Sequence, residues 1–426
     1  MSPTAAPGGA DARGAAPSLR ARLRAAALAA APGAGRPTVL GPGTALLAAP
    51  APRLLVVRPD HLGDVLLAGP ALRALCAAWP AARVTFLVGP WAAAVAERMP
   101  GAHHVATLAF PWFDRRPGGP PWRRYARLAA ATRAVRRLPA APFHAAVVLR
   151  DDDYWSAWVL KLAGVPLRLG HADPCARRFL SHVLPPGGRP EHVAAAGIAL
   201  VAALVGHPAA DMPTPATHPL CFQPSEGDRS AAREALAAAG LTEIGRRRPI
   251  AVHPGSGSPI KRWRWGAWRE TLAALTQPGE PVVVTGTAAE RRLTAELANA
   301  AGRPVVDLTG RTDVGTLAAV FERCRLVMGP DSGPLHLAVA AGTPTVHLFG
   351  PADARRFGPW GPPQRHAVVT SRLPCAPCGR LDWPRPADHP CVRTLAVEDV
   401  VRAARGVLAA AGAAGRDPPP EPCGTP

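Results

Sequence analysis

The sequence predicts an α/β protein with two doubly wound parallel-sheet domains in tandem. Short apolar segments typical of buried strands alternate with segments of helical periodicity over 51–215, and the alternation restarts over 246–412. A stretch rich in proline and turn residues separates the two series. Such alternation favours βαβ units and parallel sheets. Two domains of this kind typically bind ligands at the carboxyl ends of their strands, in a central cleft that both domains face.

The first domain begins after residues 1–50, whose Ala, Pro and Gly content predicts a disordered or loosely held extension. Its strands are predicted at 53–57, 83–89 and 144–150. A helix is predicted to start near Asp64 and to continue through the apolar run that follows. We expect this domain, 51–215, to form one parallel sheet covered by helices.

Residues 216–245 are predicted to form a linker and a leading helix. The second domain follows, with strands predicted at 249–255, 281–286, 304–310, 325–329 and 344–350. Helical segments separate them, and the last helix is predicted over about 397–411. The tail, 413–426, is rich in proline and is predicted to be disordered.

The composition excludes several classes of protein. Hydrophobic residues make up 48% of the chain and charged residues 19%, which is typical of a soluble globular protein. No apolar run is long enough to cross a bilayer, so no membrane-spanning segment is predicted. Eight cysteines scattered over 426 residues favour a reducing, cytoplasmic compartment. A contact with the inner face of the cytoplasmic membrane stays open.

The net charge of +19 is distributed unevenly. Residues 51–220 carry 19 basic and 10 acidic side chains, whereas residues 221–426 carry 25 and 19. The larger excess of basic over acidic side chains in the first domain favours an anionic ligand or an anionic membrane surface. A solvated arginine-rich surface accounts for this excess equally well. No nucleic-acid recognition motif accompanies the charge, so nucleic acid is not an expected partner.

One of the only two lysines of the chain, Lys261, follows a Gly-Ser-Gly turn in the segment HPGSGSPIKRW, 253–263. The turn lies at a strand-to-helix junction, where small residues let backbone N–H groups approach an anion. A lysine ammonium can follow a departing phosphate more easily than the planar arginine fork. The segment predicts a diphosphate site that includes Lys261; an exposed surface lysine is the alternative.

The segment LVMGPDSGPLHLAVA, 326–340, predicts a second junction of this kind. Ser332 can cap the following helix and also donate to a phosphate oxygen. Asp331 suits sugar hydroxyls better than phosphate, which it would repel. An ordinary capped turn is the alternative.

A carboxylate is predicted at the corresponding junction of the first domain. Asp64 follows Gly63 between the first strand and the first helix, where it can take a proton from an acceptor hydroxyl. A first-turn aspartate that only interacts with the helix dipole is the alternative. Asp60 and His61 lie in the same loop and can fill the same role.

Three segments together resemble glycosyltransferase family 9, the heptosyltransferases, over about residues 53–405. GPDSGPLHLAVAAGTPTVHLFGP resembles the family's D-[ST]-G-x-x-H-x-A block and the strand after it. HPGSGSPIKRW nearly matches a second block, and GDVLLAGPALRAL resembles the opening motif.

The resemblance implies a GT-B fold and an inverting, metal-independent transfer of heptose from ADP-heptose to a hydroxyl of a glycan or glycolipid acceptor, expected to be anionic. It makes Asp64 the general base and assigns Lys261 to catalysis as well as to the donor. The donor site it implies comprises Ser256, Lys261, Glu290, Asp331, Ser332, Gly333 and His336. A nucleotide-sugar epimerase, another nucleotide-sugar-dependent transferase and a non-catalytic sugar-nucleotide-binding subunit stay open as alternatives.

Three further features carry weaker predictions. The basic segment 121–138 can grip an anionic acceptor or a membrane through Arg123 and Arg124, or simply pack its apolar stripe on its own domain. Asp151 is expected either to contact acceptor hydroxyls or to cap a helix. No cofactor is expected. Zinc spacing is present in the C-terminal segment, but free or disulfide-bonded thiols are expected there instead of a structural zinc site at Cys375, Cys378, His389 and Cys391.

Overall fold

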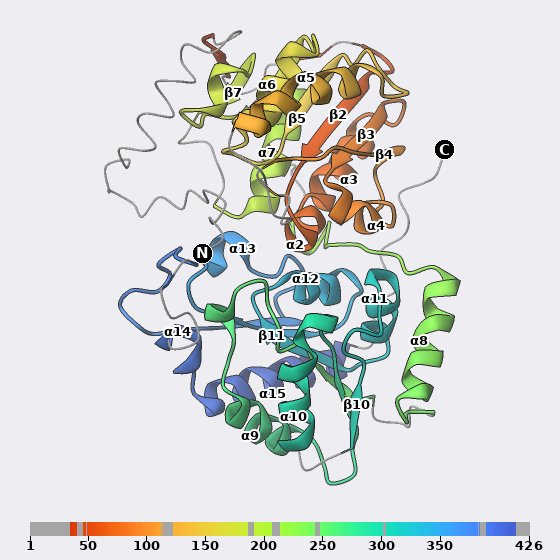
Figure 1. Ribbon diagram of the computed structural model, residues 1–426, viewed down its shortest axis with the longest axis vertical. Coiled ribbons are helices and arrows are strands. Elements are labelled where there is room, and N and C mark those ends of the chain that lie inside the picture. The colour runs from red at the N-terminus through yellow and green to blue at the C-terminus, as the bar shows by residue number, and fades with distance from the viewer. Residues whose placement is uncertain are drawn as a thin grey trace. The chain divides into compact units, whose positions relative to one another are not determined.

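A computed structural model of the chain describes residues 35–40, 46–47, 49–111, 113, 122–185, 191–206, 214–242, 248–300, 304–381, 383 and 389–414. The chain divides into two compact units, and the boundary falls between Thr214 and Pro215 (Figure 1). Each unit contains one parallel sheet. The two doubly wound sheets predicted from the sequence are therefore confirmed.

The sheet of the first unit has the order β1-β7-β6-β5-β2-β3-β4, and every described pairing is parallel. Its strands are β1 (Thr38–Val39), β2 (Arg53–Arg58), β3 (Arg83–Val88), β4 (His104–Thr107), β5 (Ala145–Val148), β6 (Leu167–His171) and β7 (His182–Leu184). Its helices are α2 (Leu62–Leu66), α3 (Gly69–Ala78), α4 (Ala93–Ala96), α5 (Trp122–Arg136), α6 (Tyr154–Leu162) and α7 (Val193–Val205), with 3₁₀ turns η1 (Pro90–Ala92) and η2 (Ala176–Arg178).

The sheet of the second unit has the order β10-β9-β8-β11-β12-β13, again parallel throughout. Its strands are β8 (Ile250–Val252), β9 (Val282–Val284), β10 (Val305–Asp307), β11 (Leu326–Pro330), β12 (Thr345–Phe349) and β13 (His366–Thr370). Its helices are α8 (Glu226–Ala238), α9 (Trp265–Leu275), α10 (Arg291–Ala300), α11 (Val314–Glu322), α12 (Gly333–Ala340), α13 (Ala354–Phe357), α14 (Pro390–Arg393) and α15 (Val397–Ala414), with η5 (Pro259–Lys261) and η6 (Ala288–Glu290).

In both sheets the order in which successive strands are added reverses at one internal pair of strands. Apart from the edge strand β1, each sheet runs outward from its first strand in two directions, so the chain switches sides between β2 and β5 in the first unit and between β8 and β11 in the second. Loops on the two sides of such a switch point diverge, which leaves a crevice at the carboxyl ends of the strands where ligands of doubly wound proteins bind. The fold therefore marks one candidate site in each unit.

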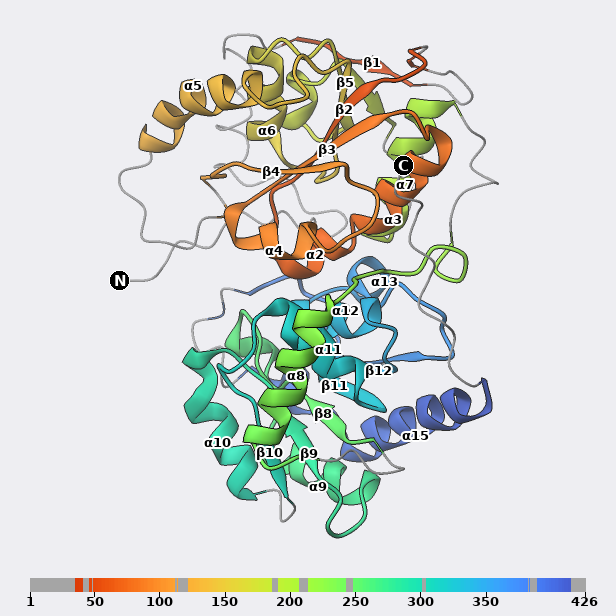
Figure 2. The ribbon, with the colours of Figure 1, turned by 90° about the vertical axis from the view of Figure 1, so that its right-hand side faces the viewer.

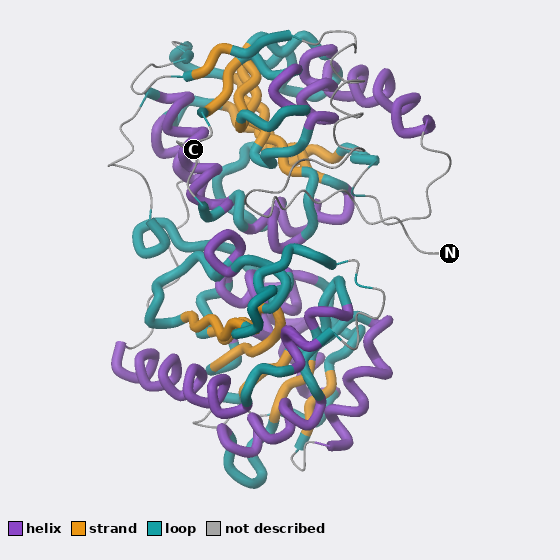
Figure 3. The backbone as a smooth tube through the Cα atoms, turned by 90° about the vertical axis from the view of Figure 1, so that its left-hand side faces the viewer, coloured by secondary structure: helices purple, strands orange, loops and turns teal. Residues whose placement is uncertain are grey.

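Helices cover both faces of each sheet (Figures 2 and 3). In the first unit α3 packs on α7, while α5 packs on α6; in the second α9 packs on α15 and α10, while α11 packs on α8 and α12. In the described part of the chain, every helix is too short or too polar to cross a lipid bilayer.

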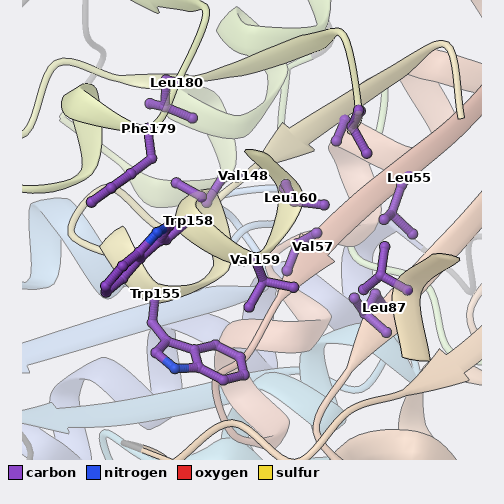
Figure 4. Close-up of a cluster of buried hydrophobic side chains, with 14 of the residues drawn as sticks. Leu55, Val57, Leu87, Val148, Trp155, Trp158, Val159, Leu160, Phe179 and Leu180 are labelled. Atoms are coloured by element: carbon purple, nitrogen blue, oxygen red, sulfur yellow. The ribbon is translucent and has the colours of Figure 1, made fainter. Parts of the chain in front are cut away.

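A cluster of aromatic and aliphatic side chains fills the space between the first sheet and α6 (Figure 4). The rings of Trp158 and Phe179 stack with their centroids 5.1 Å apart. Strand residues Leu55, Val57 and Val148 belong to the same cluster and are almost fully buried. Burial of large side chains here fixes the sheet from which the loops after β2 and β5 emerge.

Two details of the first unit differ from the expectations. The helix predicted from Asp64 is two helices, because Pro70 lies at the second position of α3, where it has no N–H to continue α2. Residues 38–39, expected to lie in a loose extension, pair with β7 as an edge strand; residues 1–34 lie outside the described residues.

The linker predicted over 216–245 is partly packed against the second unit. The backbone N–H groups of Leu220 and Phe222 donate to carbonyls of Trp360 and Ala340. The leading helix predicted in this stretch is present as α8. The last helix continues to Ala414, and residues 415–426 of the predicted tail lie outside the described residues.

Candidate functional site

The switch point of the second unit brings two of the predicted junctions together. β8 leads into the turn at 253–258 and then into η5, whereas β11 leads into Asp331, Ser332 and α12. Because β8 and β11 are neighbours, both turns emerge from the same edge of the sheet. The Lys261 Nζ atom lies 2.6 Å from Asp331 Oδ2 and also donates to the Asp331 carbonyl oxygen at 3.3 Å.

Both partners of this ion pair are mostly shielded from solvent, with side-chain exposures of 17% for Lys261 and 9% for Asp331. A partly buried ion pair is held more firmly than an exposed one, because water screens it less. An ammonium group is therefore fixed beside the N-terminus of α12, where the helix dipole adds positive potential. The arrangement suits a ligand that carries both an anionic group and hydroxyl groups.

Close backbone packing makes this approach of the two strands possible. A Cβ atom at Gly329 would lie 2.5 Å from the carbonyl oxygen of His253 and would overlap the side chain of Leu335. Only glycine fits between β11 and the end of β8 without displacing one of them. Gly329 thus sets the separation of the two site-forming turns.

Ser332 occupies the N-cap position of α12, but its side chain makes no capping hydrogen bond. The expected capping role is therefore wrong. Its Oγ atom is shielded from solvent and has no hydrogen-bond partner among the described residues. A shielded hydroxyl without a partner is costly, and a ligand oxygen at the start of α12 would satisfy it. Gly333 follows as the first residue of the helix.

The turn after β8 packs against the carboxylate of Glu290 at Gly255. Glu290 Oε2 accepts hydrogen bonds from the backbone and the hydroxyl of Thr287, at 2.9 and 2.8 Å, and so caps η6. A Cβ atom at Gly255 would collide with the Glu290 carboxyl group. Ser256 Oγ donates to the carbonyl of Ser258 within the turn. Glu290 and Ser256 thus both stabilise the loop that carries Lys261.

A seam of buried histidines lies behind Asp331. His336 Nε2 is 4.0 Å from Asp331 Oδ1, and the His336 and His347 rings are 5.7 Å apart. His347 and His366 both contact the Thr345 hydroxyl at 2.9 Å. Burial lowers the pKa of His366 to about 3 and that of His347 well below its usual range. These two imidazoles are neutral and form part of the core.

His253, the residue that follows β8, is neutral for the same reason. Its ring nitrogen Nδ1 contacts the Thr285 hydroxyl at 2.9 Å, and burial lowers the pKa of His253 to about 4. It ties the end of β8 to the end of β9.

The switch point of the first unit carries the Asp64 junction. Asp64 lies in the first turn of α2, and its Oδ1 accepts a hydrogen bond from Arg58 Nη2 at 3.1 Å. The side chain of Asp64 is 34% exposed, whereas that of Asp60 is 4% exposed and is paired with two arginines. Of the two carboxylates in this loop, Asp64 is the accessible one, and Asp60 has a structural position.

The acidic run after β5 has divided roles. Asp152 pairs with Arg150, and Asp153 caps α6 by accepting from the backbone of Ser156 at 3.0 Å. Capping, which was one of the two roles expected of Asp151, is performed by Asp153. Asp151 lies half-buried in the turn before it.

Comparison with known proteins agrees with this architecture. The family model of glycosyltransferase family 9 (heptosyltransferase) matches residues 131–382. Lipopolysaccharide heptosyltransferase 1 of Pseudomonas aeruginosa is 30% identical over 342 residues, which cover 76% of this chain and 86% of the relative. The chain belongs to glycosyltransferase family 9.

Further relatives and solved structures agree with the family 9 assignment. Lipopolysaccharide heptosyltransferase 2 of Salmonella typhimurium is 25% identical over 338 residues, 75% of this chain and 88% of the relative. The family 9 structure from Veillonella parvula superposes with a TM-score of 0.68 at 21% identity, covering 84% of this chain and 97% of that one. ADP-heptose lps heptosyltransferase II of E. coli gives 0.64 at 22% identity, covering 84% and 98%. The fold is GT-B.

The basic segment predicted over 121–138 of this family 9 glycosyltransferase forms α5 in its described part. The side chains of Arg123 and Arg124 lie outside the described residues. Later in α5, Leu128 and Val135 pack on the core, while Arg127 and Arg133 are exposed. In this part the helix packs its apolar stripe on its own unit, which was the alternative to an acceptor or membrane contact.

The C-terminal cysteine segment has mixed exposure. Cys375 is exposed and Cys391 is buried, and burial raises the pKa of the Cys391 thiol to about 11. His389 caps α14 by accepting from the backbone of Cys391 at 3.3 Å. Within the described ranges, no group of three or more His, Cys, Asp or Glu side chains is arranged to hold a metal ion.

Proposed function

We propose that this family 9 glycosyltransferase transfers heptose from ADP-heptose to a hydroxyl of a lipopolysaccharide-type acceptor, with inversion and without a metal ion. The observation that carries the proposal is the Lys261–Asp331 pair at the switch point of the second sheet. Three of the proteins named above, from Pseudomonas aeruginosa, Salmonella typhimurium and E. coli, are lipopolysaccharide heptosyltransferases, and the last is named for ADP-heptose.

The donor half of the reaction is assigned to the second unit. The Lys261 ammonium and the N-terminus of α12 supply the positive charge that a leaving diphosphate needs. Ser332 Oγ, which has no partner among the described residues, donates to a phosphate oxygen. Asp331, already held by Lys261, accepts hydrogen bonds from heptose hydroxyls, and His336 lies next to it. Ser256, Glu290 and Gly333 support the diphosphate and the ribose.

The acceptor half is assigned to the first unit. Asp64 takes the proton of the acceptor hydroxyl as the oxygen attacks the anomeric carbon, and the bond from that carbon to the diphosphate oxygen breaks. ADP leaves with the bonding electron pair, and Lys261 neutralises the added charge. Attack of the acceptor oxygen on the face of the anomeric carbon opposite the departing diphosphate gives inversion in a single step. Asp151 is assigned to acceptor hydroxyls.

The test is an assay of the full chain with ADP-heptose and heptose-free lipopolysaccharide. We expect release of ADP together with a heptosylated product, and no turnover with UDP-glucose or GDP-mannose. Asp64→Asn should abolish transfer while ADP binding, measured by calorimetry, persists. Conversion of the nucleotide sugar without acceptor would indicate an epimerase, and binding without any turnover would indicate a non-catalytic subunit. Full transfer by Asp64→Asn would remove Asp64 from the base role.

A further inference from the structure

A buried charge network joins the ends of β2 and β5. Arg58 is the last residue of β2, and its Nε atom lies 2.7 Å from Asp60 Oδ2. Arg150, which follows β5, pairs with the other oxygen of the same carboxylate. Burial alone would raise the pKa of Asp60, but the neighbouring guanidinium groups of Arg150 and Arg58 hold this pKa below its usual range. The Asp60 carboxylate is therefore charged and fixed between two arginines.

The surroundings hold this network in place. Trp91 Nε1 donates to the backbone carbonyl of Asp60 at 2.9 Å. Arg150 also pairs with Asp152 at 2.5 Å and lies over the ring of Phe113, 5.0 Å from its centroid. None of these contacts involves Asp64. They immobilise the loop between β2 and α2 independently of any ligand.

Arg58 transmits this rigidity to Asp64. One guanidinium group makes three contacts with different nitrogens: Nε with Asp60, Nη1 with the carbonyl of Leu149 at 3.3 Å, and Nη2 with Asp64 at 3.1 Å. The Arg58 side chain is 7% exposed, whereas Asp64 keeps 34% exposure. The planar fork of arginine fits such a set of partners, and a lysine ammonium does not.

We infer that Arg58 is the positioning residue for the Asp64 carboxylate, and that the Arg150–Asp60 pair holds Arg58 in place for this task. The inference rests on the proposed role of Asp64 as general base. A fixed guanidinium aims the carboxylate at the acceptor and favours its ionised form, so that the base is available at lower pH.

The charges near Asp64 determine what removal of Arg58 does. The other titratable side chains of the two loops are Asp60, His61, Arg150, Asp151, Asp152 and Asp153. The two short segments η1 and α4, which pack against α2, contain no titratable residue. Loss of Arg58 removes a positive charge that contacts Asp64 directly, while the negative charge of Asp60 remains in the same loop. Protonation of Asp64 becomes easier.

The experiment compares Arg58→Gln and Arg58→Lys with Arg53→Gln, a matched control at the opposite end of the same strand. Arg53 is the first residue of β2, at the end opposite to Arg58, and its side chain donates to the carbonyl of Pro142. The readouts are kcat and the pH profile of kcat/KM, with ADP-heptose and heptose-free lipopolysaccharide, and ADP affinity by calorimetry. Circular dichroism checks that each variant is folded.

We expect Arg58→Gln to lower kcat by roughly 10- to 100-fold and to move the acid limb of the profile up by about one pH unit. Arg58→Lys should lower kcat but leave the acid limb near its wild-type position, because the charge remains while the geometry is lost. Arg53→Gln should match the wild type, and ADP affinity should be unchanged in all three. A purely structural role for Arg58 would not move the acid limb.

Wild-type kcat and an unmoved acid limb in Arg58→Gln would overturn the inference. If that variant does not fold, Arg58→Lys decides: an undiminished kcat in a folded Arg58→Lys protein overturns it equally. The base proposal fails separately, since only full transfer by Asp64→Asn contradicts it. An inactive Asp64→Asn beside an unaffected Arg58→Gln would remove the positioning role alone.

Discussion

The Lys261 ammonium lies 2.6 Å from the Asp331 carboxylate, although the two residues are 70 positions apart in the chain. Each partner compensates the other in the unliganded protein. A diphosphate beside Lys261 must share this cation with Asp331, which ties phosphate binding to the orientation of the residue proposed for the sugar.

Removal of the Lys261 charge should weaken catalysis and, because the shielded Asp331 carboxylate loses this partner, should also lower stability. We expect Lys261→Met to lower kcat/KM for ADP-heptose by roughly 100- to 1000-fold, because the departing diphosphate loses its cation. Lys261→Arg should recover only part of this loss, since the charge returns without the mobility of an ammonium. Lys161→Met, which changes the only other lysine, is the control. Equal activity of Lys261→Met and Lys161→Met would contradict the assignment.

The packing at Gly329 gives a prediction on stability. In Gly329→Ala the new methyl group meets the backbone oxygen of His253, which cannot move without shifting β8. We expect a loss of about 1–3 kcal/mol in the free energy of unfolding, measured by urea titration, and weaker ADP binding. Gly266→Ala, where the new Cβ would lie 3.9 Å from the carboxylate of Glu270 in the same helix, should cost nothing. Similar values for both variants would argue against close packing at Gly329.

How far the sequence predicted this site depends on the kind of contact. Lys261 and Asp331 were both placed at strand-to-helix junctions, because glycine-rich turns after apolar runs are local features. Their direct pairing was not predicted, since it depends on β8 and β11 being neighbours in the sheet. The Arg58–Asp60–Arg150 network was missed for the same reason: Asp60 and Arg150 are 90 residues apart.

The strands that were not predicted are short. β1 and β7 have two and three residues, too few to show a period, and pairing with a neighbour stabilises them. The break between α2 and α3 could have been predicted from Gly69 and Pro70, a helix-breaking pair inside an apolar run. His253 gave no signal, because its neutral, buried state depends on Thr285 in another strand.

The buried histidines of the second unit should make it sensitive to acid. The pKa values of His253 and His366 are lowered by burial to about 4 and about 3, from 6.5 in the unfolded chain. The unfolded chain thus binds more protons below pH 6.5, and stability is lost as the pH falls from there toward these values. We expect the melting temperature of His366→Asn to be lower than that of wild type at neutral pH but to fall less on acidification. His104→Asn, at an exposed position of the first unit, should leave the pH dependence unchanged. Parallel curves for His366→Asn and wild type would contradict the assignment.

Asp153 should make stability depend on pH in the opposite direction from the buried histidines. Burial raises the pKa of Asp153 to about 6, so the folded state holds an extra proton between the unfolded value of 3.8 and pH 6, and stability is lost as the pH rises through this window. Asn caps helices well and carries no charge. We expect Asp153→Asn to stabilise the protein by about 1–2 kcal/mol above pH 6 and to have little effect in acid. Asp313→Asn, at an exposed N-cap of α11 whose side chain accepts from the backbone of Thr316, should be nearly neutral at every pH. Equal effects of the two substitutions would show that burial of Asp153 has no such cost.

Ser332 offers a test in which stability and ligand affinity change independently. Its Oγ atom is shielded and lacks a partner among the described residues, so Ser332→Ala removes no hydrogen bond that the structure describes. We expect an unchanged or slightly higher melting temperature without ligand. ADP affinity should fall by about 10-fold or more, because a hydrogen bond to a charged phosphate is lost.

The matched control for Ser332 is Thr343→Ala, which deletes a buried hydroxyl just beyond the other end of α12. The Thr343 hydroxyl donates to the carbonyl of Phe321 at 2.8 Å. This variant should lose about 1 kcal/mol of stability and keep its ADP affinity, the reverse of the pattern for Ser332→Ala. If Ser332→Ala instead lowers stability and leaves ADP binding intact, Ser332 belongs to the protein framework, and the phosphate must bind elsewhere than at the start of α12.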